Sequence, residues 1–164
     1  MMKMRTRQHR RSHEEPEGGQ VSVDLAGLWP EAFAGEKYLL VMVRRDTRMV
    51  LCAPLPNKTS HGIKEAMTDF KLALKGVWRF HSDRGKEFMG EMDHWMIENL
   101  IVHTTTPGYD SKANGIAERA IQEVTQGIRS LLHQAGAPRM LWAEAARHFC
   151  SILNRRPRPS PDGK

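Results

Sequence analysis

Residues 77–88 read VWRFHSDRGKEF, and this stretch decides how the rest of the chain is interpreted. Its first five residues are rich in aromatic and β-branched side chains, which favour a strand. Ser82, Asp83 and Gly85 follow directly, and residues of these types favour turns. The pattern therefore predicts a strand that opens into a loop, with Asp83 at the junction.

Three further strand-like segments precede this stretch, at residues 21–25, 38–43 and 49–53. Turn-forming residues separate them, so that neighbouring segments can pair as an antiparallel meander. Asp24 lies within the first segment. The sequence thus predicts an α/β protein in which Asp24 and Asp83 both belong to strands or strand ends.

Apolar residues at helical spacing predict helices at residues 59–74, about 92–98, 115–135 and 141–153. Gly76 is expected to end the first helix, and Pro138 to separate the last two. The apolar pair Ile101 and Val102 predicts a short last strand. A loop rich in turn formers then leads to the long helix, and Glu118 lies in the first turn of that helix.

Length, charge and cysteine content limit the class of protein. The 164 residues suit one domain, which we place at 21–159, with a flexible leader at 1–20 and a tail at 160–164. A net charge of +6 favours polyanionic partners. The two cysteines form no C-x-x-C pair, and no apolar run is long enough to cross a bilayer. We therefore expect an intracellular protein without membrane contact.

Three acids stand where they could converge at one edge of the sheet: Asp24, Asp83 and Glu118. Carboxylates held that close repel one another unless divalent cations neutralise them, which makes such a cluster a natural Mg²⁺ or Mn²⁺ site. Two ions roughly 4 Å apart would activate the attacking oxygen and stabilise the leaving oxygen in phosphoryl transfer. The alternative for each acid is structural, because Asp is common in turns and the helix dipole favours Glu in a first turn.

Two segments carry a resemblance to a known family. Residues 82–88 (SDRGKEF) resemble the S-D-N-G-x-E-F segment of retroviral and retrotransposon integrases, and residues 114–119 (NGIAER) resemble their N-G-v-A-E-R segment. The similarity is greatest to copia-type elements and extends through residues 141–145 and 153–157. It covers roughly residues 21–159, which is most of the chain.

This resemblance implies an RNase H-like fold, with a five-stranded mixed sheet flanked by helices. Matched residue by residue, the catalytic and metal-binding triad of the family falls on Asp24, Asp83 and Glu118. The resemblance also implies two Mg²⁺ or Mn²⁺ ions and DNA integration. In that reaction a polynucleotidyl transferase trims the 3′ ends of a retroelement, as an endonuclease, and joins them to target DNA in the nucleus. The chain would then be a polyprotein fragment that forms homo-oligomers in its full-length context.

Five basic or polar residues near the predicted triad are candidates for DNA contact: Arg84, Lys86, Lys112, Asn114 and Arg119. A polar loop and a helix start beside the metal ions would face the phosphate backbone of the substrate. For any one of them, ordinary solvated surface is an equal alternative. Arg84 also departs from the family pattern, because it stands where the family has Asn.

Two other functions stay open from the sequence. One is a catalytically inactive domain that retains the integrase fold and binds nucleic acid. The other is an RNase H-type nuclease that cuts RNA in a hybrid and shares the metal ions, although residues 114–119 favour the integrase. The dependence of strand joining on Mg²⁺ or Mn²⁺ and on Asp83 would separate the integrase from the inactive domain, and substrate preference would identify the nuclease.

Overall fold

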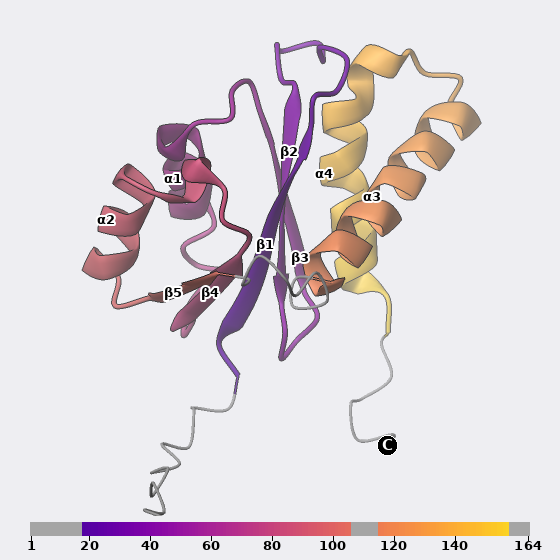
Figure 1. The fold of residues 1–164 in the computed structure, drawn as a ribbon. Helices are drawn as coiled ribbons and strands as arrows, with labels where there is room; N and C mark the ends of the chain where they lie inside the picture. Colours follow the sequence, from indigo (N-terminus) through magenta and orange to yellow (C-terminus); the bar gives the residue numbers. More distant parts are fainter. Residues whose placement is uncertain (1–17, 106–114, 158–164) are drawn as a thin grey trace, which may run out of the picture.

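A five-stranded mixed sheet forms the centre of the computed structural model, which describes residues 18–105 and 115–157 (Figure 1). The strands lie in the order β3-β2-β1-β4-β5: β1 (Gln20–Gly27), β2 (Tyr38–Arg44), β3 (Val50–Leu55), β4 (Arg79–Ser82) and β5 (Val102–Thr105). β1, β2 and β3 pair antiparallel, as the meander predicted, whereas β4 and β5 run parallel to β1. The predicted five-stranded mixed sheet of an α/β protein is confirmed.

Helices cover both faces of this sheet. α1 (Ser60–Asp69) and α2 (Glu91–Glu98) lie on one face, and α3 (Gly115–Gln134) and α4 (Trp142–Arg155) lie on the other (Figure 1). Two short 3-10 helices, η1 (Lys86–Phe88) and η2 (Arg139–Leu141), precede α2 and α4. None of the helices in these described ranges is long and apolar enough to span a membrane.

β2 shows why both faces of the sheet are buried. Leu40 and Met42 pack with the core on the α1 and α2 side, whereas Leu39, Val41 and Val43 pack on the α3 and α4 side. Successive side chains of a strand point to opposite faces, so a strand covered on both sides requires an unbroken apolar run. β1 lies beside this strand, in the middle of the sheet, with β4 on its other side.

One predicted helix limit is wrong. The helix expected at residues 59–74 ends at Asp69, and the chain continues through turns to Gly76. Thr68 Oγ1 donates a hydrogen bond to Lys64 O at 2.9 Å, a contact that competes with regular helical bonding. Leu74 is buried all the same, so its spacing reflected packing and not helix. The other helices and strands begin and end within a few residues of their predicted limits.

The folded chain includes residues that the sequence assigned to the leader. Trp78 Nε1 donates to Gly18 O at 2.8 Å, and Gly19 N donates to Asp46 Oδ2 at 3.0 Å. β1 begins at Gln20, one residue before the predicted domain. These hydrogen bonds fasten the start of β1 to the turn between β2 and β3 and to the segment before β4.

Candidate active site

β1 and β4 bring the first two predicted acids side by side. The strands are parallel, and Ser22 pairs with His81. The pairing ends there, and Asp24 and Asp83 each lie two residues further along their parallel segments. An extension of the same register would therefore bring them next to each other. Asp24 is half-buried on β1, whereas Asp83 is exposed in the loop that follows β4.

Glu118 comes from α3, which packs against β1 and β2. It lies in the first turn of that helix, as predicted, and is exposed. The negative charges of Asp83 and Glu118 both act on Asp24, and Glu87 of η1 adds a third. We call these four residues, Asp24, Asp83, Glu87 and Glu118, the acid cluster.

Burial raises the pKa of the Asp24 carboxyl above its ordinary value, and repulsion from the rest of the acid cluster raises it further. Leu25 N donates a hydrogen bond to Asp24 Oδ1 at 2.8 Å. This bond stabilises the charged form of Asp24 and so opposes the rise in pKa. A divalent cation would relieve the repulsion that remains.

The donor chemistry of the acid cluster fits a hard divalent cation, because Mg²⁺ and Mn²⁺ prefer carboxylate oxygens. The side chains do not yet converge. Within residues 18–105 and 115–157, no three His, Cys, Asp or Glu side chains are placed so that together they could hold a metal ion. Asp83 and Glu118 are both exposed, so their side chains have room to rotate toward Asp24.

The loop after β4 is folded closely around Glu87. Gly85 N donates a hydrogen bond to Asp83 Oδ1 at 3.0 Å within this loop. Gly85 itself has φ −62°, a value that any residue adopts. Space favours glycine here, because a Cβ at this position would lie 2.5 Å from the carboxyl carbon of Glu87 and the Glu87 side chain would have to shift.

Sequence analysis assigned no role to Glu87, which the structure places under this loop. Its side chain is only 5% exposed, and its Oε1 lies 2.8 Å from Lys58 Nζ. Lys58 lies in the segment before α1, so the ion pair joins two loops that are far apart in sequence. In the sequence, Glu87 lies close to Asp83 and matches the Glu of the S-D-N-G-x-E-F segment, but neither observation reveals that its side chain is buried.

Ser82 and His103 tie the ends of β4 and β5 together. Ser82 Oγ and His103 Nε2 are 2.8 Å apart, and His103 Nδ1 lies 3.4 Å from Asp93 Oδ1 of α2. The same order of side chains occurs in serine hydrolases. Ser82 is only 1% exposed, however, so its hydroxyl cannot reach a substrate, and the arrangement is structural.

Three of the five candidates for DNA contact lie within the described chain. Arg84 and Lys86 are exposed next to Asp83, and Arg119 is exposed next to Glu118. Lys112 and Asn114 lie outside the described residues. Exposed basic side chains therefore accompany both Asp83 and Glu118.

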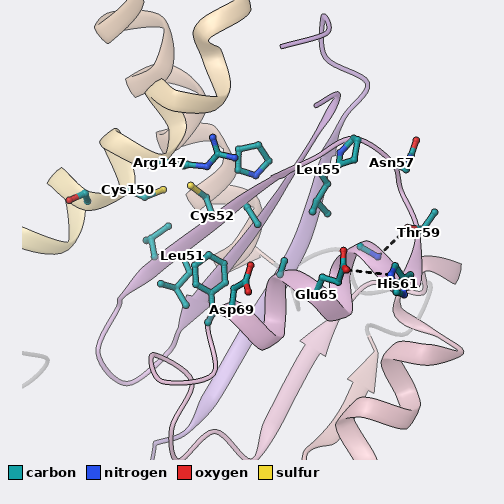
Figure 2. A pocket seen from close by; sticks show the side chains of 18 of the residues that line it. Leu51, Cys52, Leu55, Asn57, Thr59, His61, Glu65, Asp69, Arg147 and Cys150 are labelled. Carbon is teal, nitrogen blue, oxygen red and sulfur yellow. Dashed lines mark hydrogen bonds and ion pairs between the residues drawn. The ribbon is translucent and has the colours of Figure 1, made fainter. Parts of the chain in front are cut away.

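A pocket of about 620 Å³ lies elsewhere, between β3, α1 and α4 (Figure 2). Its lining includes Cys52, His61, Arg147 and Cys150, and no member of the acid cluster. Both cysteines are free thiols, and Figure 2 shows them facing one another from β3 and α4. The acids of the predicted site thus stand at an exposed surface and not in this pocket.

No known protein-family profile matches the chain, but individual proteins do. It is 28% identical over 136 residues to the retrovirus-related Pol polyprotein from transposon TNT 1-94 of Nicotiana tabacum. The aligned region covers 77% of this chain and 10% of that protein. It is 28% identical over 128 residues to the corresponding polyprotein from transposon RE1 of Arabidopsis thaliana, which covers 75% and 8%. The chain therefore spans about a tenth of the length of these relatives.

Solved structures match over most of the chain. The catalytic core domain of BIV integrase matches with a TM-score of 0.66 and 18% identity, over 85% of this chain and 86% of that one. The HTLV-2 integrase catalytic core domain in complex with magnesium matches with a TM-score of 0.69 and 18% identity, over 88% and 90%. This chain has the integrase-core fold.

The comparisons confirm two expectations drawn from the motifs. The predicted RNase H-like fold is present, and the homologues are Pol polyproteins of plant transposons, as the resemblance to copia-type elements implied. Within this fold, the members of the acid cluster come from β1, the end of β4, η1 and the start of α3.

Proposed function

We propose that the chain is the catalytic core of a retrotransposon integrase, a polynucleotidyl transferase that trims the 3′ ends of the element and joins them to target DNA. One observation carries the proposal. Asp24, Asp83 and Glu118, which match the triad of the family, come from three separate elements and yet lie close enough for the charges of Asp83 and Glu118 to act on Asp24. The polyprotein relatives and the integrase-core fold support it.

The triad would hold two Mg²⁺ or Mn²⁺ ions. When bound, such ions activate the attacking oxygen and neutralise the leaving oxygen of a phosphodiester. Asp24 is half-buried on a central strand and bonded to Leu25 N, so it provides the fixed ligand. Asp83 and Glu118 are exposed and complete the site by rotating toward it. The HTLV-2 core, which has the same fold, was solved in complex with magnesium.

DNA is the proposed partner, both as the element ends and as the target. Arg84, Lys86 and Arg119 would hold phosphates near the acid cluster, and Lys112 and Asn114 are proposed to join them. The net charge of +6 favours such binding through the release of counterions. We further propose that the chain forms a homo-oligomer in its full-length context, because the matched HTLV-2 core was solved in a trimeric form. We also propose that it acts in the nucleus, where its DNA target lies.

A strand-joining assay with the whole chain and DNA oligonucleotides that carry matched element ends tests the proposal. Joined products should require Mg²⁺ or Mn²⁺ and should disappear in the variants Asp24→Asn, Asp83→Asn and Glu118→Gln. The control is Asp69→Asn, which removes an exposed carboxylate at the end of α1 and should leave joining intact. Joining that persists in Asp83→Asn would overturn the proposal.

One observation favours a second candidate, an inactive domain that binds nucleic acid. Arg84 stands where the family has Asn. Such a domain would bind DNA equally well with or without Asp83 and would join no strands. Preferential cutting of RNA in an RNA–DNA hybrid would instead identify a nuclease.

A further inference from the structure

An ion pair with one buried member lies close to the predicted metal site. The Glu87 side chain is 5% exposed, and Lys58 Nζ lies 2.8 Å from its Oε1. Burial of an unpaired carboxylate costs several kcal/mol, so a buried glutamate needs a cationic or hydrogen-bonding partner. Lys58 is 48% exposed, so its amine reaches in from the surface to provide that partner.

Both members of this ion pair interact electrostatically with the predicted triad. The Glu87 carboxylate repels that of Asp24. The Lys58 amine is attracted by Asp83 as well as by Glu87. The Glu87 carboxylate also fills the space beside Gly85, in the turn where Gly85 N holds Asp83 Oδ1. Two opposite charges thus stand close to two of the three predicted metal ligands.

We propose that Lys58 and Glu87 form a positioning and charge-tuning pair that sets how tightly the triad binds divalent cations. The inference rests on the proposed function, because it takes Asp24, Asp83 and Glu118 as the metal ligands. Glu87 raises the negative potential at the site and Lys58 lowers it. Because the two act in opposite directions, the intact pair keeps the affinity for the cation at an intermediate value.

This arrangement predicts changes of opposite sign in the two single variants. Lys58→Gln leaves Glu87 uncompensated and should tighten Mn²⁺ binding. Glu87→Gln leaves Lys58 uncompensated and should weaken it. Each change should be about three- to tenfold, which is the effect of one unit charge at a partly screened distance. The double variant Lys58→Gln/Glu87→Gln removes both charges and should return to nearly the wild-type affinity.

Calorimetric titration of the whole chain with Mn²⁺, at constant ionic strength, measures these affinities without any need for strand joining. The matched control is Lys64→Gln, which removes the same charge from α1. Lys64 lies 3.6 Å from Glu91 and pairs there on the surface, so its loss should leave the affinity unchanged. Thermal melts identify any variant that fails to fold.

The decisive comparison is between Glu87→Gln and the double variant. If Glu87 only supports the fold of the loop, the double variant should bind Mn²⁺ as weakly as Glu87→Gln, or more weakly. Recovery of affinity in the double variant supports charge tuning. If Lys58→Gln alone does not fold, this comparison still tests charge tuning, because both Glu87→Gln and the double variant lack the buried carboxylate that would be left without a partner.

Failure of the inference is distinguishable from failure of the proposed function. Mn²⁺ binding that requires Asp83 in the wild type, together with no recovery in the double variant, overturns the tuning pair alone. Absence of Mn²⁺ binding in the wild type, or binding that survives Asp83→Asn, overturns the proposed metal site and the tuning pair with it.

Discussion

At the proposed metal site, Asp24 is expected to favour a bound cation at the expense of stability. Its carboxyl is half-buried and surrounded by the other members of the acid cluster, and both conditions favour the protonated form. Near neutral pH it must nevertheless be ionised in order to bind a metal ion. The cost of keeping this half-buried carboxylate ionised should therefore lower the free energy of unfolding. Perturbed pKa values of this kind are common at functional sites.

The variant Asp24→Asn should be more stable than the wild type at neutral pH, with a melting temperature higher by about 3 °C. The pKa of Asp24 is higher in the folded than in the unfolded state, so ionisation destabilises the fold. This gain in stability of Asp24→Asn over the wild type should be absent below the ordinary aspartate pKa, where Asp24 is protonated in both the folded and the unfolded state. It should grow as the pH rises through the folded-state pKa and then stay constant.

Thermal melts without divalent ions, across this range of pH, measure the effect. The control Asp69→Asn, at an exposed position on α1, should change the melting temperature little at any pH. A melting temperature for Asp24→Asn that falls below the wild type at neutral pH would contradict the argument.

At the scale of elements, the packing of α3 on α4 decides where Glu118 stands. Gly127 of α3 has no side chain, and the ring of Phe149 on α4 occupies the space that a Cβ would need. The two helices can therefore approach closely on the face of the sheet opposite α1 and α2 (Figure 1). Because Glu118 lies on the same helix, a shift of α3 would move this acid relative to β1.

We expect Gly127→Ala to lower the free energy of unfolding by about 1–3 kcal/mol, which is typical of overpacking in a core. Phe149→Leu in the same chain should restore part of the loss, because the shorter side chain vacates the space. Gln126→Ala, on an exposed position of α3, is the control. Chemical denaturation provides the measurement, and equal stability of Gly127→Ala and the wild type would show that the helices are not in close contact here.

At the scale of the whole molecule, the distribution of positive charge should govern the proposed binding of DNA. Its net charge is +6 despite the acid cluster, and Arg84, Lys86 and Arg119 are exposed beside the acids. Phosphate contacts release counterions, so affinity should fall as salt concentration rises. This term does not depend on catalysis and can be measured on an inactive variant.

We predict that Arg84→Ala weakens DNA binding and reduces the slope of log affinity against log salt by about 1, the effect of losing one phosphate contact. Fluorescence anisotropy with Asp83→Asn as the parent chain isolates binding from turnover. Lys71→Ala, at an exposed position in the turn after α1, should keep the slope of the parent. Equal slopes for both variants would place Arg84 outside the DNA contact.

The sequence by itself determined the order of helices and strands and the three acids of the proposed triad. Alternation, helical spacing and turn chemistry are properties of short segments, and the motifs around Asp83 and Glu118 are continuous in the chain. Helical spacing of apolar residues gave a wrong helix limit at Leu74, because this residue is buried by packing although it lies beyond the end of α1. The roles of Lys112 and Asn114 stay predictions, because both lie outside the described residues.

Only the tertiary structure decided which charges act on one another. It placed β1 parallel to β4, buried Glu87 and paired it with Lys58, and brought the Glu87 carboxylate into the space that a side chain at Gly85 would need. Burial and electrostatic interaction depend on distances between groups that are far apart in the chain. Such distances arise from the packing of whole elements, which no pattern within a single segment encodes.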